Sequence, residues 1–236
     1  MGKVGRPPQD PARQAERAHR ILDAAAELIL RWGYDKTTID DVAKRAEVSK
    51  GTIYLHWKTR DELFSALLRR ERVHMLAEVR RSEPATLSAV SGEIARTLLR
   101  RPLLKAVLSG DSEVLGKLTR QKRQGTGGLE PGDAFEGYLA ELIRLGTVRD
   151  KPGDHIRVIN SIVYGFLMLP GGASLPGDTI ADLVADTVER AMSPGREPTD
   201  EQAAAMARAT LDFLDAVEEI AQRRLAGSLG SKERMK

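Results

Sequence analysis

The sequence contains no cysteine, and aromatic residues make up only 4% of its 236 residues. The first absence excludes disulfide bonds, thiolate metal sites and cysteine nucleophiles from this chain. Long hydrophobic runs are also missing. The longest, residues 156–169, is interrupted by Arg157 and Asn160 and is shorter than the ~20 residues of a membrane span. The first ten residues lack the apolar core of a signal peptide, so we expect a soluble, cytoplasmic protein without a membrane segment.

Motifs that support catalysis are scarce as well. The four histidines lie in separate segments, and the chain has no glycine-rich phosphate loop and no Gly-x-Ser-x-Gly nucleophile elbow. Glu71, His74 and Glu78 would share one face of a helix, but a carboxylate-bridged metal site needs a second Glu-x-x-His, which the sequence does not contain. We therefore expect no enzyme activity, no metal and no cofactor.

The net charge of +3 is unevenly distributed. Residues 1–60 hold 12 Lys and Arg against 8 Asp and Glu, a charge of +4, whereas residues 61–236 hold 25 against 26, a charge of −1. A basic segment on a nearly neutral body is typical of a protein that binds phosphates, and nucleic acid in particular.

Three hydroxyl residues in the first third of the chain stand where helices are expected to begin. Thr38 is followed three positions later by Asp41, and Thr59 by Glu62, which is the spacing of a capping box, while Ser49 precedes a third helical pattern. The helices that this pattern predicts are 39–46, 50–56 and a long one from residue 60 to about 81. Two short helices joined by a tight turn form a helix-turn-helix, in which the second helix enters the major groove of DNA.

The second short helix carries small and hydrogen-bonding groups on the side opposite its apolar residues. We expect Lys50 and Thr52 to face the groove, Tyr54 and Lys58 to meet phosphates, and Leu55 to touch a thymine methyl. Arg6 lies in a basic, proline-containing arm that either binds DNA or is an idle tail. The candidate DNA-binding residues are Arg6, Thr38, Ser49, Lys50, Gly51, Thr52, Tyr54, Leu55, His56 and Lys58.

These residues resemble the DNA-binding domain of the TetR (tetracycline-repressor) family of bacterial transcriptional regulators. The resemblance covers roughly residues 15–68 and rests on Thr37-Thr38, Val48-Ser49-Lys50-Gly51-Thr52 and Tyr54-Leu55-His56-Trp57. Two positions depart from the family pattern: Trp57 replaces the commoner Phe, and Glu47 stands where Gly is frequent. The resemblance implies a homodimer that binds a palindromic double-stranded DNA operator, usually as a repressor, and that a small-molecule effector releases.

The remaining chain reads as helical throughout, so the fold class that we expect is all-α. A support helix from Asp10 to Trp32 should bury a stripe that runs from Ala18 to Trp32. Later helices are expected at 85–100, 102–109, 111–122, 133–145, 155–169, 178–192 with Asp178 as its cap, and 199–225. The parts are a disordered basic arm at 1–9, a helix-turn-helix DNA-binding domain at 10–58, an effector-binding and dimerisation domain at 59–226, and a flexible tail at 227–236.

The second domain offers candidates for an effector site and for a dimer interface. Helix 155–169 is apolar on nearly every side, so we expect it to form the interface with helix 178–192, with Val163 facing the partner. The extra helix 199–225 either extends that interface or covers the effector pocket. Candidate effector-binding residues, with core packing as the alternative for each, are Met75, Phe135, Tyr138, Asn160 and Tyr164. An architectural DNA-binding protein without an effector is the alternative function.

Overall fold

The protein folds into an elongated assembly of helices, seen here in a computed structural model. The structure describes residues 11–115, 132–151, 153–168 and 176–229, and no strand occurs within them. The helices are α1 (Pro11–Trp32), α2 (Ile39–Arg45), α3 (Lys50–His56), α4 (Arg60–Arg81), α5 (Leu87–Leu99), α6 (Pro102–Ser109), α7 (Ser112–Leu115), α9 (Gly132–Arg144), α10 (His155–Met168), α11 (Gly177–Met192) and α12 (Asp200–Leu229). The expected all-α class is confirmed.

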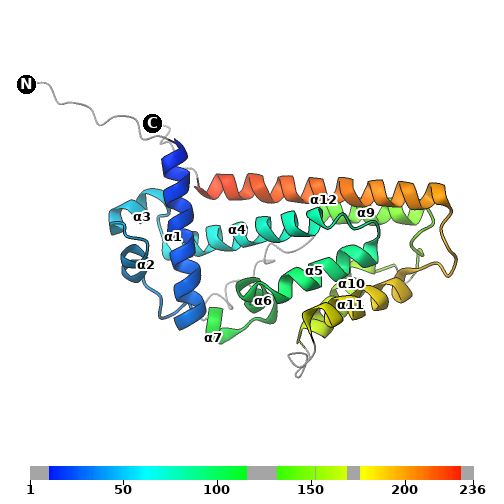
Figure 1. Cartoon of the computed structure of the whole chain (residues 1–236), viewed down its shortest axis with the longest axis horizontal. Coiled ribbons are helices and arrows are strands. Elements are labelled where there is room, and N and C mark those ends of the chain that lie inside the picture. The colour runs from blue at the N-terminus through cyan, green and yellow to red at the C-terminus, as the bar shows by residue number, and fades with distance from the viewer. Residues whose placement is uncertain (1–10, 116–131, 152, 169–175, 230–236) are drawn as a thin grey trace, which may run out of the picture.

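The helix-turn-helix lies at one end of the molecule, where α1 crosses the beginning of α4 (Figure 1). The helices α5, α6, α10 and α11 lie on one side of α4, and α12 lies along its other side and continues over α9. Because α4 begins beside α3 and ends in the second half of the molecule, it connects the two ends directly. None of the described helices combines the length and hydropathy needed to span a bilayer.

The hydroxyl residues cap the helices as their spacing predicted. Thr38 forms a complete capping box with Asp41 at the start of α2, and the Ser49 side chain accepts a hydrogen bond from the Thr52 amide at the start of α3. Thr59 caps α4 by accepting from the Glu62 amide, but the Glu62 carboxylate accepts from the Lys58 amide instead of the Thr59 amide. These caps fix where α2, α3 and α4 begin, and therefore how α3 is aimed.

The apolar residues of the DNA-binding end form one core that includes the beginning of α4. Ile21, Val42 and Ile53 from α1, α2 and α3 are completely buried against Phe64. Trp32, expected at the end of the buried stripe of α1, is instead 42% exposed, and Tyr34 in the following turn is buried in its place. The chain turns at Gly33, which has φ +80°, so the register of the helix no longer decides which residue points inward.

The last helix, α12, returns from the far end of the molecule to the helix-turn-helix (Figure 1). It extends to Leu229, beyond the expected end near residue 225, so the expectation of a flexible tail from 227 is wrong for residues 227–229. α12 packs along α4 and α9, and its Phe213 and Val217 join the wall of an internal cavity. Of the two alternatives for this helix, the structure thus supports the one in which it covers the pocket.

One other expectation is wrong, and several lie outside the described residues. Asp178 does not cap α11, because the helix begins at Gly177 with Pro176 in the cap position and no side-chain cap bond. The Asp178 carboxylate instead pairs with Arg96 of α5 and with Arg100, which directly follows that helix. The arm with Arg6, the expected helix beyond Leu115, the glycine-rich segment before α9 and residues 230–236 lie outside the described residues.

Candidate functional site: a DNA-binding surface and an internal cavity

The recognition helix α3 has one buried and one exposed face. Ile53 and, just beyond the helix, Trp57 are buried in the core. On the opposite face Leu55 is 59% exposed and Tyr54 is 45% exposed, and Gly51 and Lys58 are exposed as well. The adjacent side chains of Tyr54 and Leu55 expose apolar surface beside the polar residues of this face, so the face is the natural candidate for contact with DNA.

The N-terminus of α3 is held by hydroxyl groups. Ser49 Oγ lies 3.1 Å from the Thr52 amide nitrogen and 2.9 Å from Thr52 Oγ1. Lys50 Nζ lies 2.5 Å from a carboxylate oxygen of Asp40 on α2. Both side chains of that ion pair are about half exposed, so Lys50 can exchange Asp40 for a phosphate or a base edge at small cost.

Gly51 leaves space at the surface of α3. A Cβ placed on it would meet only Ser49 Oγ, at 3.7 Å, which is ordinary van der Waals contact. The fold therefore does not require glycine here. A glycine that packing does not demand fits a surface where another backbone approaches closely.

His56 does not lie on the exposed face with the other candidates. Its ring is half-buried, forms a hydrogen bond with the backbone of Leu229 in α12, and lies near the positive charge of Arg17. Burial is the largest cause that lowers its pKa below the ordinary 6.5, and Arg17 lowers it further, while the bond to Leu229 acts in the opposite direction. His56 therefore belongs to the contact between the helix-turn-helix and α12.

Thr38 and the turn before α3 complete the helix-turn-helix. Thr38 Oγ1 accepts from the Asp41 amide. The hydroxyl and the amide of Thr38 both donate to the Asp41 carboxylate and lower the pKa of that carboxyl. The turn contains Glu47 at φ +54°, a left-handed conformation that L-residues adopt at a cost. Glu47, which stands where Gly is frequent in the family, thus has the backbone conformation that favours glycine.

A partly enclosed cavity of ≈ 130 Å³ lies between α4, α5, α6, α9, α10 and α12. Four of the five candidate effector-binding residues line it: Met75, Phe135, Asn160 and Tyr164. Val163, which was expected to face a dimer partner, lines the cavity instead. The polar groups of the lining are few, and the hydroxyl of one of them, Ser91, donates to the Leu87 carbonyl of its own helix.

Tyr138, the fifth candidate, lies outside this cavity. Its hydroxyl is 2.8 Å from Thr210 Oγ1, and its ring stacks on Phe213 at 4.6 Å between centroids. Burial raises the pKa of Tyr138 to about 12. Because Phe213 does line the cavity, Tyr138 supports the wall from behind.

Sequence reasoning missed most of the cavity wall, and Phe213, Val217 and Arg72 show why. Phe213 and Val217 come from α12, whose apolar pattern predicted a packed face but not the helices that it packs against. Arg72 looked like one of several arginines in the run Arg69-Arg70-Glu71-Arg72, where nothing marks which of them faces inward. Its position on α4, three residues before Met75, was the one available signal, because residues three apart share a helix face.

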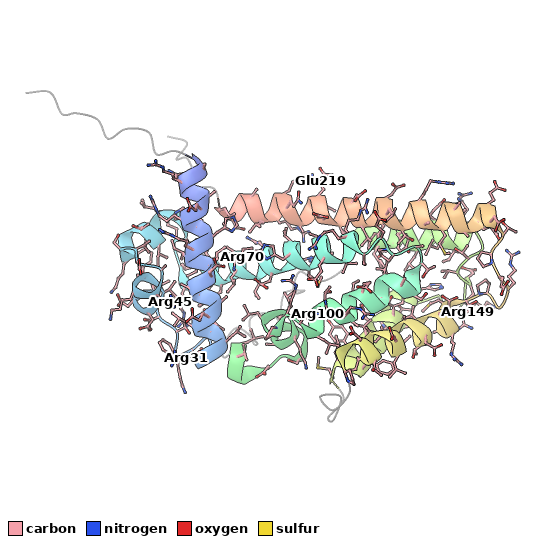
Figure 2. All side chains as sticks on the ribbon, viewed as in Figure 1. Arg31, Arg45, Arg70, Arg100, Arg149 and Glu219 are labelled. Carbon is pink, nitrogen blue, oxygen red and sulfur yellow. The ribbon has the colours of Figure 1, made fainter. Side chains whose placement is uncertain are left out.

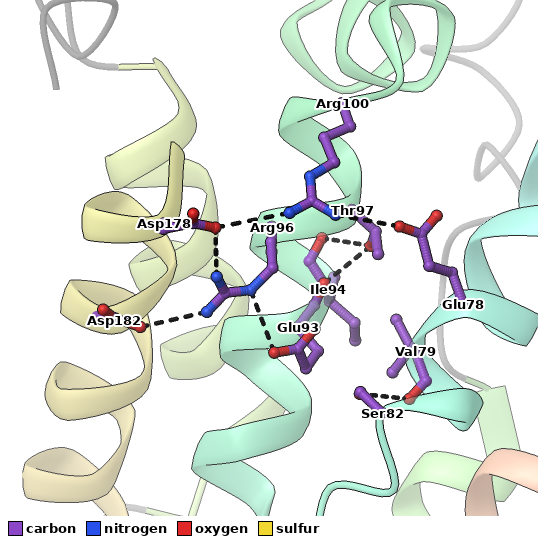
Figure 3. Close-up of polar contacts among 10 residues, drawn as sticks. All are labelled: Glu78, Val79, Ser82, Glu93, Ile94, Arg96, Thr97, Arg100, Asp178 and Asp182. Carbon is purple, nitrogen blue, oxygen red and sulfur yellow. Dashed lines mark hydrogen bonds and ion pairs between the residues drawn. The ribbon is translucent and has the colours of Figure 1, made fainter. Parts of the chain in front are cut away.

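A series of ion pairs connects the two ends of the molecule. Arg70, which is 4% exposed, bonds the His19 carbonyl and Asp23 of α1 and lies near Glu71 (Figure 2). Glu71 and Glu78 of α4 both pair with Arg101. From Glu78 the series continues through Arg100 to Asp178 of α11, and Arg96 joins Asp178 to Asp182 (Figure 3). A shift of α4 therefore changes polar contacts at both α1 and α11.

Comparisons with known proteins agree on one family. Residues 21–67 match the family described as "Bacterial regulatory proteins, tetR family". The HTH-type transcriptional repressor Rv1474c of Mycobacterium tuberculosis is 36% identical over 184 residues, which cover 75% of this chain and 95% of that repressor. The chain belongs to the TetR family. Its relatives are transcriptional regulators and not enzymes, and this protein is likewise a transcriptional regulator.

Other TetR-family relatives show how the similarity is distributed. The fatty acid metabolism regulator protein of Bacillus subtilis is 26% identical over 175 residues, covering 70% of this chain and 87% of that protein. The regulator QacR of Staphylococcus aureus is 43% identical over 49 residues, only 21% of this chain and 26% of QacR. Identity is thus highest in short matches and lower where a match extends along most of the chain.

The TetR-family chain also exposes large apolar side chains on α10 and α11. On α10, Tyr164 and Met168 are exposed, and Leu183 is exposed on the neighbouring α11. α11 is held closely against α5, since a Cβ on Gly92 would lie 3.0 Å from the Ala181 carbonyl oxygen. This close packing sets the position of α11 and so the shape of the exposed face.

Proposed function

We propose that this protein is a homodimeric repressor that binds a palindromic operator through α3 and leaves it when a small molecule enters the cavity. The observation that carries the proposal is the capped α3 of a TetR-family chain, with Tyr54 and Leu55 exposed on its outer face. The name repressor follows relatives such as Rv1474c.

The candidate DNA-binding residues fall into two groups according to their place on α3. Lys50, Gly51 and Thr52 form its first turn, which would meet base edges, and Tyr54 and Lys58 lie toward its end, where the phosphates pass. Leu55 is placed to touch a thymine methyl group. The ion pair of Lys50 with Asp40 would open when DNA binds, because both side chains are about half exposed and such a pair contributes little to stability.

A dimer would join two chains through α10 and α11. The exposed Tyr164, Met168 and Leu183 supply apolar surface, which stabilises association at about 25 cal/mol per Å² buried. Two half-sites on B-DNA lie about 34–36 Å apart, so the dimer must hold its two α3 helices at that spacing. Leu183→Asp should give monomers in sedimentation velocity, and the control Leu30→Asp, an exposed leucine of α1, should leave the dimer intact.

Release by an effector would act through the helices that connect the cavity with the helix-turn-helix. α4 contributes Met75 to the cavity and its first turns to the core under α3. α12 contributes Phe213 to the cavity and its last residues to the contact with His56 and Trp57. An architectural DNA-binding protein has no use for such a cavity, so its presence favours the regulator.

Selection of DNA fragments by the purified protein, followed by fluorescence anisotropy on the selected site, tests this function. We expect one preferred palindrome and two chains per site. Enrichment of no particular sequence, with equal affinity for random fragments, would favour the architectural alternative. Binding of a single chain per site with full affinity would contradict the dimer.

A further inference from the structure

We infer that the cavity takes a small molecule with an apolar body of about six carbons and one anionic group, of the carboxylate class, which Arg72 binds. The inference rests on the proposed function only in treating the cavity as the effector site. It adds the chemical class of the ligand, which the fold and the family leave open.

Arg72 is the one charged side chain among the described residues that line the cavity. Its Nε is buried and has no hydrogen-bond partner among the described residues. Burial is the largest cause that lowers its pKa, and the nearby charge of Arg224 lowers it further. A cation placed against apolar groups and beside another cation is unfavourable until an anion joins it.

The neighbouring arginines show that this arrangement is specific to Arg72. Arg70 pairs with Asp23 of α1, and Arg80 pairs with Asp215 of α12 at 2.5 Å. The Nε atoms of Arg70 and Arg101 are also buried without a partner, but the outer guanidinium nitrogens of both pair with carboxylates. Arg72 has no carboxylate partner in the part of the chain that the structure describes, so a carboxylate ligand in the cavity would be its first.

The rest of the lining sets the size and character of the ligand. Met75, Ile94, Leu98, Phe135 and Val217 present an apolar surface around a volume of ≈ 130 Å³. An engineered apolar cavity of about 150 Å³ admits benzene, so a ring or chain of about six carbons matches the space. The carboxylate would bind the guanidinium of Arg72 by charge-assisted hydrogen bonds.

The position of Arg72 also connects the ligand with the DNA-binding end. Arg72 lies on α4 and its like-charged neighbour Arg224 lies on α12, one turn before Ser228, which contacts Trp57. An anion on Arg72 reduces the repulsion between the two helices. Binding would therefore draw α12 toward α4 near the helix-turn-helix.

The test compares three probes of equal length by isothermal titration calorimetry: hexanoate, 1-hexanol and hexylamine. We expect hexanoate to bind at least tenfold more tightly than hexanol, and hexylamine not to bind. Arg72→Met should abolish the preference for hexanoate and Arg72→Lys should keep part of it. The control Arg81→Met, on an exposed arginine of the same helix, should change nothing.

A second variant shows whether the apolar body lies inside the cavity. Ile94→Phe fills the lining without touching a charge, and it should weaken binding of both hexanoate and hexanol at least tenfold. Unchanged hexanoate binding by this variant would place the anion on the surface and overturn the inference. Equal affinity of the wild-type protein for hexanoate and hexanol would overturn it as well.

Operator release separates this inference from the proposed function. If hexanol releases the selected operator as well as hexanoate does, the ligand class is wrong while the effector switch stands. If hexanoate binds through Arg72 but leaves the affinity for the operator unchanged, the ligand class stands while the switch is wrong.

Discussion

Trp57 Nε1 donates a hydrogen bond of 2.9 Å to the backbone carbonyl of Ser228, across 171 residues of sequence. The bond joins the end of the recognition helix to the end of α12. Arg69 of α4 also bonds the Ser228 hydroxyl, and Leu229 packs against the core of the DNA-binding end. The helix-turn-helix is thus held by α12 as well as by α4, and both helices line the cavity.

Removing this bond should loosen the end of α12. Trp57→Phe keeps an aromatic ring in the core but removes the indole N–H, so we expect a loss of about 1 kcal/mol in the free energy of unfolding. Amide exchange at residues 225–229 should become faster. The matched control, Trp32→Phe, changes an exposed indole and should alter neither quantity; the same loss in both variants would contradict the account.

The N-terminal elements were predictable from sequence because their boundaries depend on local chemistry. The caps at Thr38, Ser49 and Thr59 each require one hydroxyl and one amide a few residues away, and the structure forms all three. The exposure of Leu55 followed in the same way from the periodicity of a short helix.

The cavity was only partly predictable because its wall joins residues distant in sequence. Met75 and Phe135 were identified from their side-chain types. Tyr138 was predicted to line the cavity but lies behind its wall, because a buried aromatic residue gives the same sequence pattern in both places. His56 was assigned to the DNA because the predicted recognition helix carries it on its outer side. The pattern of α12 could not reveal that the backbone of Leu229 would form a hydrogen bond with His56.

The stability of the protein should fall with acidification because of His56. Its pKa is lowered in the folded state, so the unfolded chain binds more protons and stability rises with pH. The stability that depends on neutral His56 is fully present above its unfolded pKa near 6.5. It is lost as the pH falls from there toward the lower pKa of His56 in the folded protein. Thermal melts of the wild type and His56→Gln between pH 7.5 and 5 should show a smaller fall in the variant.

The control for this experiment is His74→Gln. The pKa of His74 is also lowered by burial, but Glu71 acts in the opposite direction, and Leu229 is not among the groups that shift it. We expect acid to increase amide exchange at residues 225–229 in the wild type and in His74→Gln, but not in His56→Gln. Identical exchange in all three proteins would refute the assignment to His56.

The turn before α3 should become more stable with glycine. Glu47 has φ +54°, where an L-residue pays about 1–2 kcal/mol that glycine does not, although glycine loses more entropy on folding. Glu47→Gly should therefore raise the free energy of unfolding by about 0.5–1 kcal/mol in urea denaturation. Glu47→Ala retains the Cβ and should bring no such gain, which separates backbone strain from the loss of the charge.

Lys58 and Thr52 should affect DNA binding in different ways. Lys58→Ala should weaken binding to selected and random DNA alike and lower the salt slope by about one, because it removes one phosphate contact. Thr52→Ala should instead change which operator is preferred. The hydrogen bond from the Thr52 amide to the Ser49 side chain survives the substitution, so α3 should stay folded. If both variants lose equal affinity for selected and for random DNA, the two residues do not differ in role.

The most direct test of the account is the affinity of Gly51→Ala for the selected operator, measured by fluorescence anisotropy beside its thermal melt. A Cβ at Gly51 meets only Ser49 Oγ at 3.7 Å, so the variant should melt at the same or a higher temperature. If α3 enters the major groove with this residue against the DNA, the same variant should bind the operator at least tenfold more weakly. Unchanged operator affinity in the folded variant would contradict the placement of α3 on DNA.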